Sequence, residues 1–391
     1  MSTVLEMARG IQPRSVELVR WFHAHPEVSG KETETAKRIL EELDEIGGYS
    51  IRAGVNGCGI LADMEGGAPG PKIALRADMD ALQITEETGL AFASENHGVM
   101  HACGHDNHVT MLLGAARLLS AMRGDISGSV RLIFQPAEEL SPVGGAKGMI
   151  AAGAMDGVDT VFGLHVWPDL PVGTFGTRPG PLMASSDHFS VHIDGKSSHG
   201  AKPNAGIDAV VAGSQFVTAL QTIISRNLDP MQSAVISVGR FVSGTRYNII
   251  AEKCELEGTC RTFEPGVREM AERRLNEVLH GICVLSGCNG SLDYEHGYCS
   301  VVNDAAQAEY MLNTAAELFG PDSVTVPEQP SMCAEDFAFY LREKPGAFAW
   351  LGTALKGQES YPLHNCHFTA PEEILWRGAA LFTQIVLGYG R

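Results

Sequence analysis

The sequence predicts an α/β protein in which an open, mostly parallel sheet flanked by helices is interrupted by a smaller α+β domain. Two observations predict this fold class. Apolar strand segments alternate with helical segments in the first and last parts of the chain, as is typical of a parallel sheet. Between them the element order becomes β-α-β-β-α-β, which is typical of a ferredoxin-like domain. We therefore expect one domain from residues 1–184 and 299–391, and an inserted domain from residues 185–298.

Length and composition narrow the class of protein. The 391 residues can form two cores, and a net charge of -18 without a basic cluster argues against a nucleic-acid partner. The first residues have no apolar core behind a basic start, and no window is apolar enough to cross a membrane. Nine scattered cysteines are an odd number for a disulfide framework and indicate a reducing compartment. We expect a cytoplasmic protein without a membrane partner.

The first elements are expected to be two helices and two strands. One helix runs from about Val16 to Phe22, and Ser29 or Thr33 can cap the next one. The strands are GCGILADME and KIALRADMDAL, and the second leads into Asp78 and Asp80 on one face. These two carboxylates either mark the carboxyl edge of the sheet, where sites form, or are solvated in a loop.

The rest of the chain is organised around one stretch, Val99 to Leu119, which reads VMHACGHDNHVTMLLGAARLL. A turn rich in potential ligands leads directly into a helix with a buried face. Cys103 and His105 can face the same way from an extended turn, and a thiolate beside an imidazole suits zinc, cobalt, nickel or manganese better than calcium or magnesium. The alternative is that His101, His105 and His108 cap and pack the helix.

Three later segments supply further candidate residues. The strand Val130–Phe134 leads to the adjacent pair Glu138 and Glu139, whose side chains point in different directions. One carboxylate can therefore bind a metal while the other reaches a bound water, although such a pair also suits the start of a helix. His165 follows another apolar strand, as a ligand or as a core residue. His364 lies in a loop before the last predicted helix.

The inserted domain begins with the strand SDHFSVHID and a Gly/Ser turn that carries His199. Its other elements are expected to be a helix, two strands, a helix and a strand, over Ile207–Arg226, Ala234–Phe241, Ile249–Thr262, Pro265–Leu285 and Gly290–His296. The α/β pattern resumes after it with a helix over Ala305–Phe319 and the strand AFAWLGT. The inserted segment is thus flanked by two parts of one domain.

Five potential ligands stand at the edge of a strand or the start of a helix: Cys103, His105, Glu139, His165 and His364. Five are more than one zinc ion requires. They suit two divalent ions about 3.5 to 4 Å apart that share a bridging ligand and a water, an arrangement that lowers the pKa of the water and polarises a carbonyl. Glu138 would then take the proton.

Six motifs, in this order, resemble the hippurate hydrolase and auxin-conjugate amidohydrolase branch of the aminoacylase/carboxypeptidase metallopeptidases: MHACGHDNH, PAEE, GLHVWP, GKSSHGAKP, SMCAEDFA and PLHN. The resemblance covers nearly the whole chain. It implies a zinc-peptidase-like catalytic domain with an inserted lid and dimerisation domain, and two divalent ions per chain, either Zn, Mn, Co or Ni. It also implies hydrolysis of the amide bond of N-acyl amino acids or similar small conjugates, by a homodimer.

The resemblance also implies roles for individual residues. Cys103 bridges the two ions, and the other four ligands complete their coordination. Glu138 is the general acid and base, and His199 stabilises the oxyanion, either in its own chain or across a dimer. The remaining expected site residues are two substrate contacts and two carboxylates behind the ligands: Asn248 and Arg261, and Asp78 and Asp80.

The chain departs from the family pattern at a few positions. Asn204 stands where relatives usually have a His, and Cys333 where Gly is common. The Pro usually found near His364 is replaced in the run HNCHF, which adds Cys366 and His367. His367 competes with His364 as a ligand, and we favour His364. These changes leave the expected ligands intact but put the substrate pocket in doubt.

Two other functions stay open. The same chemistry can act on a dipeptide or on the C-terminus of a peptide. A catalytically silent protein that binds metal or acylated ligands is a second alternative, although the complete set of ligands and the presence of Glu138 argue against it.

Overall fold

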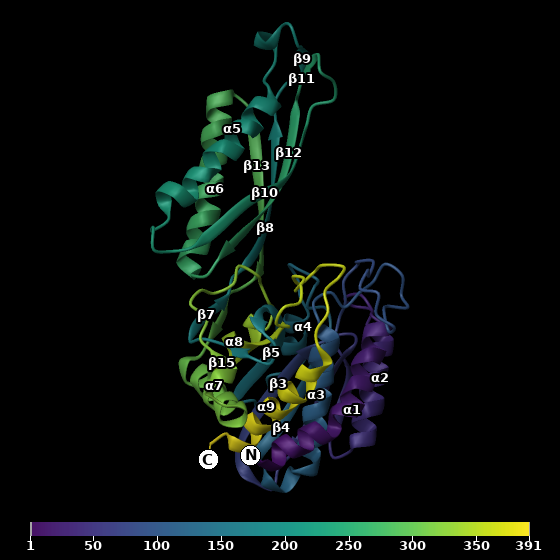
Figure 1. Ribbon diagram of the computed structural model, residues 1–391. Helices are drawn as coiled ribbons and strands as arrows, with labels where there is room; N and C mark the ends of the chain where they lie inside the picture. Colours follow the sequence, from purple (N-terminus) through teal and green to yellow (C-terminus); the bar gives the residue numbers. More distant parts are fainter. Residues whose placement is uncertain (1, 391) are drawn as a thin grey trace. The chain divides into compact units, whose positions relative to one another are not determined.

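A computed structural model describes residues 2–390 of the protein (Figure 1). The chain forms two compact units. Unit 1 comprises the described residues up to 182, residues 301–330 and those from 336 onward, and unit 2 comprises residues 183–300 and 331–335. Among the described residues, no helix has the length and apolar character that a membrane span requires.

Unit 1 is built on an eight-stranded sheet. In spatial order its strands are β1 (Ser50–Val55), β2 (Gly59–Glu65), β4 (Ser127–Gln135), β3 (Ala68–Asp78), β5 (Thr160–Pro171), β16 (Gly346–Ala354), β6 (Phe175–Gly176) and β15 (Val324–Thr325). The central strands β4, β3, β5 and β16 pair in parallel, as do β6 and β15. The pairs β1/β2, β2/β4 and β16/β6 are antiparallel. The predicted open, mostly parallel sheet is confirmed.

Helices flank this sheet. They are α1 (Ser2–Ala24), α2 (Thr33–Ile46), α3 (His105–Ala121), α4 (Ala146–Ala151), α7 (Ala305–Phe319), α8 (Ala338–Glu343) and α9 (Leu375–Gly388). Helices α1, α3 and α9 pack against one another and lie side by side in Figure 1. The short strands β7 (Gly180–Met183) and β14 (Val301–Asn303) pair with each other outside the main sheet.

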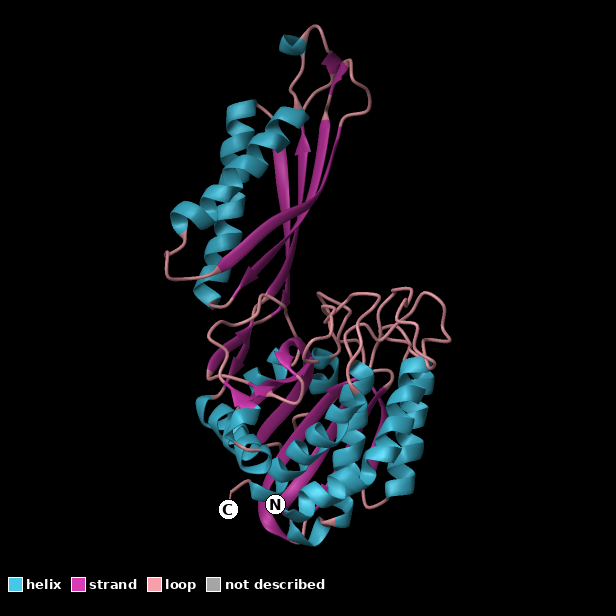
Figure 2. Cartoon of the chain, in the orientation of Figure 1, coloured by secondary structure: helices cyan, strands magenta, loops and turns pink. Residues whose placement is uncertain are grey.

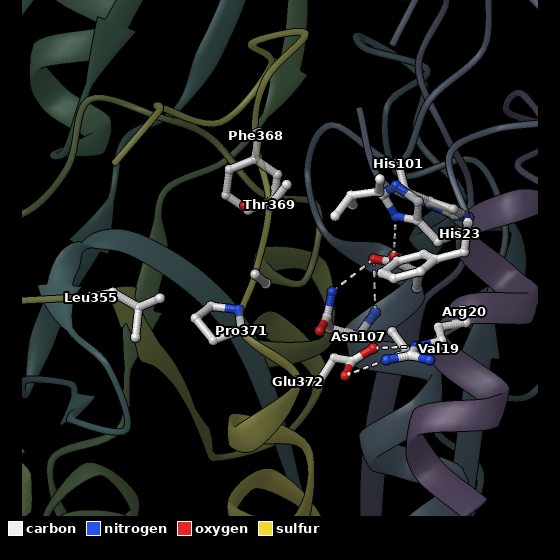
Figure 3. Close-up of a pocket in the computed structure, with 14 residues that line it drawn as sticks. Val19, Arg20, His23, His101, Asn107, Leu355, Phe368, Thr369, Pro371 and Glu372 are labelled. Carbon is white, nitrogen blue, oxygen red and sulfur yellow. Dashed lines mark hydrogen bonds and ion pairs between the residues drawn. The ribbon is translucent and has the colours of Figure 1, made fainter. Parts of the chain in front are cut away.

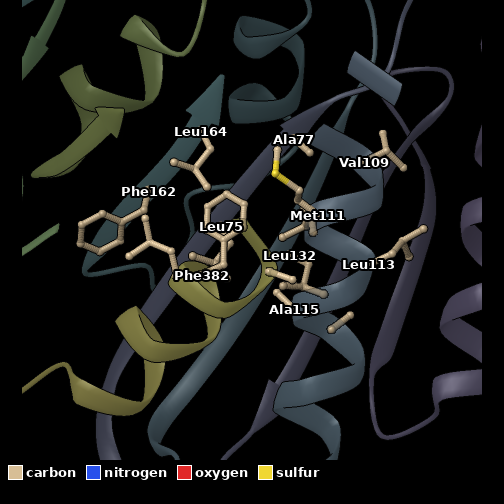
Figure 4. Close-up of a cluster of buried hydrophobic side chains, with 14 of the residues drawn as sticks. Leu75, Ala77, Val109, Met111, Leu113, Ala115, Leu132, Phe162, Leu164 and Phe382 are labelled. Atoms are coloured by element: carbon tan, nitrogen blue, oxygen red, sulfur yellow. The ribbon is translucent and has the colours of Figure 1, made fainter. Parts of the chain in front are cut away.

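The core of unit 1 fixes the position of α3. Met111 and Ala115 of α3 and Phe382 of α9 pack with Leu75 of β3 and Phe162 of β5, and all five are buried (Figure 4). Burial of each large apolar side chain contributes about 1.5 to 3 kcal/mol. Because α3 is buried along almost its whole length, the start of this helix has a fixed place at the edge of the sheet.

The carboxyl ends of three neighbouring parallel strands meet at this edge. Asp78 at the end of β3 is in register with Gln135 at the end of β4, and Arg76 is in register with Gly163 of β5, two residues before His165. Long loops gather at the same edge (Figure 2). In open α/β sheets, ligands bind outside the carboxyl ends of the strands, so this edge is the place to look for a site.

Unit 2 has the predicted α+β arrangement. Its four-stranded antiparallel sheet has the order β10 (Ala234–Ser243), β12 (Lys253–Thr262), β8 (Ser186–Asp194) and β13 (Asn289–Tyr298). The helices α5 (Ala209–Thr222) and α6 (Pro265–Ser286) complete the ferredoxin-like order. The segment expected as one strand over Ile249–Thr262 is divided, because β11 (Ile249–Ile250) leaves the main sheet to pair with β9 (Ser198–His199).

Helix α1 differs from the prediction. It extends through Pro13 to Ser2, whereas a start near Val16 was expected. A proline inside a helix removes one backbone hydrogen bond and costs about 3 kcal/mol. Val4 and Ala8, which precede the proline, are buried in the same core as Phe22. Tertiary packing therefore outweighs the local preference for a break.

The start of α2 also differs from the prediction, since neither Ser29 nor Thr33 caps it. The carboxylate of Glu27 instead accepts hydrogen bonds from the amides of Glu34 and Thr35, at 3.2 and 2.8 Å. The hydroxyl of Ser29 donates to Asp80 over 2.6 Å. Ser29 thus contributes to the carboxyl edge of the sheet rather than to the helix.

Candidate metal centre

A glycine shapes the turn that carries the first two predicted ligands. Gly104 lies between Cys103 and His105 with a φ of +82°, and a Cβ atom there would lie 2.4 Å from the side chain of Val166. Glycine alone combines this left-handed conformation with so close an approach. The turn therefore presents Cys103 just before α3 begins at His105, and both side chains are buried.

The five predicted ligands lie close together. Sγ of Cys103 is 3.4 Å from Nε2 of His165, and Oε1 of Glu139 is 3.9 Å from Nε2 of His105 and 3.2 Å from Nε2 of His364. Their donor atoms form two sets, Cys103-His105-His165 and Cys103-Glu139-His364. Within each set, every donor atom lies within 4.8 Å of the other two. Because Cys103 belongs to both sets, its sulfur is placed to bridge two cations.

Two of these donor atoms are buried without a hydrogen-bond partner among the described residues: Nε2 of His105 and Oε1 of Glu139. A buried polar atom left unpaired costs about 1 to 3 kcal/mol, so such atoms normally face a partner or a bound ligand. A cation is a partner that both atoms accept. Thiolate, imidazole and carboxylate are the ligands of zinc and its neighbouring metals. The residues therefore fit a pair of divalent cations.

The charges around the site favour a cation. Burial alone would lower the pKa of His105, but the carboxylates of Asp78, Asp80 and Glu139 raise it to about 10. Burial and the charge of Glu139 raise the pKa of the Cys103 thiol. His105 and Cys103 would hold a cation in place of their protons, and the cation would stabilise the Cys103 thiolate. Excess negative charge thus characterises the site.

Hydrogen bonds to Val166 determine which ring nitrogens face the site. The Val166 amide donates to Nε2 of His108 over 2.9 Å, so His108 carries its proton on Nδ1 and donates it to Asp78 over 2.5 Å. Nδ1 of His165 donates to the Val166 carbonyl over 2.6 Å, which leaves Nε2 without a proton and facing Cys103. Burial holds the pKa of His165 well below its ordinary value, so the ring stays neutral, as a metal ligand must be.

Asp78 and Asp80 are both buried, which excludes the alternative that a loop exposes them to solvent. Asp78 pairs with the ring of His108, as described above. The carboxylate of Asp80 accepts the amides of Glu138 and Glu139, at 3.1 and 2.9 Å, and lies 3.3 Å from Nδ1 of His105. Asp80 thereby connects the start of α3 to the loop that follows β4.

Glu138 stands next to the five ligands. Its carboxylate lies within 4.8 Å of donor atoms of His105 and Glu139, and its side chain is buried. Oε1 accepts the amide of Asp336 over 3.4 Å. The adjacent carboxylates therefore have different contacts, since Glu139 lies 3.2 Å from His364 whereas Glu138 accepts the Asp336 amide.

A buried group of charges behind Asp78 was not predicted from the sequence. Arg76 donates to Asp78 over 2.6 Å and to Asp336 over 2.8 Å, and Gln135 donates to Asp336 over 2.9 Å. Arg76 and both carboxylates have side chains with no exposed area. An arginine within an apolar strand was the available signal, because a buried guanidinium requires acidic partners.

Glu32 was also missed. It is fully buried, and its Oε1 accepts the amides of Gly30 and Ala137, both over 2.8 Å. Ala137 has a φ of +58°, which is rare for a residue with a side chain, and it directly precedes Glu138. No spacing pattern in the sequence connects Glu32 with the loop after β4.

The structure separates the competing histidines. The amide of His364 donates to the carbonyl of Ala102 over 2.8 Å, which holds it next to the ligand turn, and His364 has a φ of +66°. His367 is in neither set of ligands and lies with Glu87 instead, 3.5 Å from its carboxylate. His101 is buried, and neither ring nitrogen has a hydrogen-bond partner among the described residues.

A cavity of about 270 Å³ lies beside the ligand turn (Figure 3). Its described lining includes His101 and Asn107 from the turn and α3, together with Phe368, but none of the predicted ligands. Arg20 and Glu372, which form an ion pair, also line the cavity. The cavity is therefore distinct from the metal centre.

The other three predicted site residues belong to unit 2. His199 is exposed at the end of β9, and its Nδ1 accepts the amide of Ala201 over 3.0 Å, so Nε2 carries the proton. Oδ1 of Asn248 and Nη1 of Arg261 are buried atoms without hydrogen-bond partners among the described residues. Burial lowers the pKa of Arg261. No ion pair to Arg261 occurs within residues 2–390, and its unpaired Nη1 is suited to a ligand carboxylate.

Comparison with known proteins places this geometry in a family. N-acetylcysteine deacetylase of Bacillus subtilis is 39% identical over 379 residues, which are 97% of each chain. Thermostable carboxypeptidase 1 of Saccharolobus solfataricus is 39% identical over 374 residues, 95% of this chain and 94% of its own. The crystal structure of Bacillus subtilis YXEP, a dinuclear metal-binding M20 peptidase, superposes with a TM-score of 0.84 at 38% identity, covering 97% of this chain and 98% of that one. Residues 74–388 match the model of peptidase family M20/M25/M40. The chain is a member of this family, which confirms the resemblance noted in its motifs.

Proposed function

We propose that the protein is a metal-dependent amidohydrolase that cleaves the amide bond of N-acyl amino acids or similar small N-acyl conjugates. The observation that carries the proposal is the pair of ligand sets that share Cys103, with Glu138 beside them. The named activity of the N-acetylcysteine deacetylase relative supports this class of substrate.

Two divalent cations, either Zn, Mn, Co or Ni, would be held by Cys103, His105, Glu139, His165 and His364. When bound, such a pair polarises the substrate carbonyl and makes water a better nucleophile. The dinuclear M20 relative supports the number of ions. The donor atoms do not select one metal, because affinity among these metals depends on availability as well as on ligands.

Glu138 acts as general base and general acid in this proposal. Its carboxylate accepts a proton from the attacking water and returns it to the leaving nitrogen. The Asp336 amide donates to the Glu138 carboxylate, and the Glu138 amide donates to the Asp80 carboxylate. The base therefore has a defined place before substrate arrives. A positioned base of this kind contributes about 10² to 10⁴ in rate.

The residues of unit 2 would bind the substrate. The exposed His199, with its proton on Nε2, would donate to the developing oxyanion, in its own chain or in the partner of a homodimer. The unpaired Arg261 guanidinium would bind the carboxylate of the amino-acid part, and Asn248 would contact the acyl or amide group. Unit 2 would thus act as a lid and as the dimerisation domain. We further propose a cytoplasmic location, supported by the nine free cysteines.

Replacement of Glu138 by Gln tests the proposal. Turnover of an N-acetyl amino acid should fall by about 10² to 10⁴ while the metal content stays at the wild-type level. The matched variant Glu139→Gln should lose metal, because Glu139 belongs to a ligand set. Substantial activity in Glu138→Gln would contradict the assigned role.

A second candidate function is cleavage of dipeptides or peptide C-termini, favoured by the carboxypeptidase relative. A panel of N-acetyl and N-benzoyl amino acids, compared with dipeptides, separates the two by kcat/KM. A metal-loaded protein that binds these compounds but hydrolyses none of them would be a silent binding protein.

A further inference from the structure

A second group of metal-ligand side chains lies outside the centre described above. Glu87 precedes α3 in the chain, and Cys366 and His367 lie between β16 and α9. One donor atom from each of these three residues lies within 4.8 Å of the other two. We refer to Glu87, Cys366 and His367 as the Cys366 cluster. All three belong to unit 1, and none is a ligand of the proposed pair.

Hydrogen bonds that involve backbone groups hold the two loops of the Cys366 cluster together. The amide of Glu87 donates to the carbonyl of Cys366 over 2.9 Å. Nδ1 of His367 donates to the carbonyl of Glu87 over 2.8 Å, and the amide of His367 donates to Oδ1 of Asn365 over 2.9 Å. The two loops are therefore tied together while the thiol, the carboxylate and Nε2 of the imidazole face one another.

The hydrogen bond at Nδ1 determines the state of the other ring nitrogen. A carbonyl only accepts, so Nδ1 of His367 carries a proton. In the neutral ring, Nε2 then presents a lone pair to the Glu87 carboxylate, which also accepts only. Two acceptors face each other favourably only if a cation or a second proton lies between them. Metal-binding histidines are commonly oriented in this way, by a carbonyl at the opposite nitrogen.

The spacing of the donor atoms matches a metal better than a direct contact. Nε2 of His367 is 3.5 Å from Oε2 of Glu87, beyond the range of a good hydrogen bond, and the Cys366 thiol donates a long hydrogen bond of 3.7 Å to the same oxygen. Around a tetrahedral zinc, bond lengths of about 2.0 Å to N or O and about 2.3 Å to S separate the ligand atoms by about 3.3 to 3.6 Å. The observed separations therefore require only a small contraction.

We propose that Glu87, Cys366 and His367 form a third divalent-cation site of the zinc type, independent of the proposed catalytic pair. Thiolate, imidazole and carboxylate supply three ligands and leave the fourth position to water, because the cluster is partly exposed. The site discriminates against magnesium and calcium, which prefer oxygen ligands.

Zinc content tests the site. The full-length protein is equilibrated with excess zinc, freed of unbound metal by gel filtration and analysed for zinc per chain. We expect the wild type to retain one equivalent more than the double variant Cys366→Ser/His367→Ala. Cys333→Ser is the matched control, because Cys333 is an exposed cysteine that lies in unit 2, outside the cluster. It should retain the wild-type amount.

Cobalt provides a second measurement. The near-ultraviolet absorption of thiolate-bound cobalt should decrease in Cys366→Ser and be unchanged in Cys333→Ser. Glu87→Gln, which keeps the shape of the side chain, should weaken binding of the extra zinc at least tenfold and serves if the double variant does not fold. Equal zinc content in the wild type and the double variant would overturn the site, as would loss of the extra equivalent in Cys333→Ser. These variants leave the Cys103 sets intact, so failure here does not bear on the proposed amidohydrolase.

Discussion

The carboxylate of Glu32 accepts a hydrogen bond of 2.8 Å from the amide of Ala137, the residue directly before the proposed general base. Ala137 has a left-handed backbone, with a φ of +58°, which costs a residue with a side chain about 1 to 2 kcal/mol. A buried hydrogen bond to a charged acceptor contributes about 1.5 to 3 kcal/mol and so offsets that cost. Glu32 therefore acts on Glu138 through the backbone.

Glu32→Ala should lower kcat about tenfold or more with little change in KM, because Glu138 loses its fixed position while the substrate contacts remain. The second substitution Ala137→Gly should restore part of kcat, since glycine adopts the left-handed conformation without support. Steady-state kinetics of the two single variants and the double variant measure this. Glu32→Gln keeps an oxygen acceptor and serves as the control. If Ala137→Gly restores nothing, Glu32 acts by some other route.

Loss of the Cys103 sulfur should affect both metal ions. In Cys103→Ala each ligand set loses a member, so metal content after gel filtration should fall by nearly two equivalents relative to the wild type. His165→Ala and His364→Ala each remove a ligand from one set and should each lose about one equivalent. Metal analysis of the three variants checks this expectation. A Cys103→Ala protein that retains as much metal as His165→Ala would argue against a bridging sulfur.

The buried charges behind the site are expected to be essential for stability. Arg76→Met leaves Asp78 and Asp336 buried without their cation, which should reduce the free energy of unfolding by about 3 to 5 kcal/mol. Arg20→Met breaks the solvent-exposed pair with Glu372 and should reduce the free energy of unfolding far less, because solvent screens this pair. Urea denaturation of the metal-free proteins provides the comparison. A similar decrease in unfolding free energy in the two variants would show that the buried charges stabilise the fold no more than the exposed pair does.

His23 should make stability depend on pH. Burial alone would lower the pKa of His23, but hydrogen bonds and charges from Asp106 and Glu86 raise it from 6.5 to about 10. Because the folded-state pKa exceeds that of the unfolded chain, the stabilisation is complete below pH 6.5 and is lost as the pH rises toward about 10. The free energy of unfolding should fall across this range by an amount on the order of a few kcal/mol.

His23→Gln is the variant that isolates this effect, since glutamine can donate to a carboxylate without titrating. Urea denaturation of wild type and variant at a series of pH values gives the difference between their unfolding free energies. Both proteins have the same metal centre, so its pH-dependent contribution is absent from this difference. That difference should shrink as the pH increases. A constant difference would mean that His23 does not hold its proton in the folded state.

Local patterns predicted the parts of the site that are close in sequence or that end neighbouring strands. The spacing of Cys103 and His105 indicated a shared direction. The apolar run before His165 correctly indicated a strand, but β5 continues to Pro171, so His165 lies within the strand and not after it. The buried partners were not predicted, because their choice depends on contacts between distant segments. Arg76 and Asp336 are 260 residues apart, and Glu32 and Ala137 are 105 apart.

The order of the predicted elements was enough to give the fold class. It did not predict two local departures, the extension of α1 past Pro13 and the division of an expected strand. Packing of Val4 and Ala8 into the core carries α1 past Pro13, and the two-residue pairing of β9 with β11 divides an expected strand. The roles of His199, Asn248 and Arg261 stay predictions, because they depend on how a substrate meets unit 2. The Glu87 contacts of Cys366 and His367 likewise required the three-dimensional arrangement.

Unit 1 is discontinuous, and this has a consequence for how the protein is made. Strand β16 lies beside β5 in the sheet, and α9 packs on α1 and α3. In the chain, His364 lies between β16 and α9, more than a hundred residues after His165 of β5. A nascent chain that has already released Cys103 and His165 from the ribosome still lacks a strand of its sheet and the last donor. Full metal loading must therefore wait until His364 has left the ribosome.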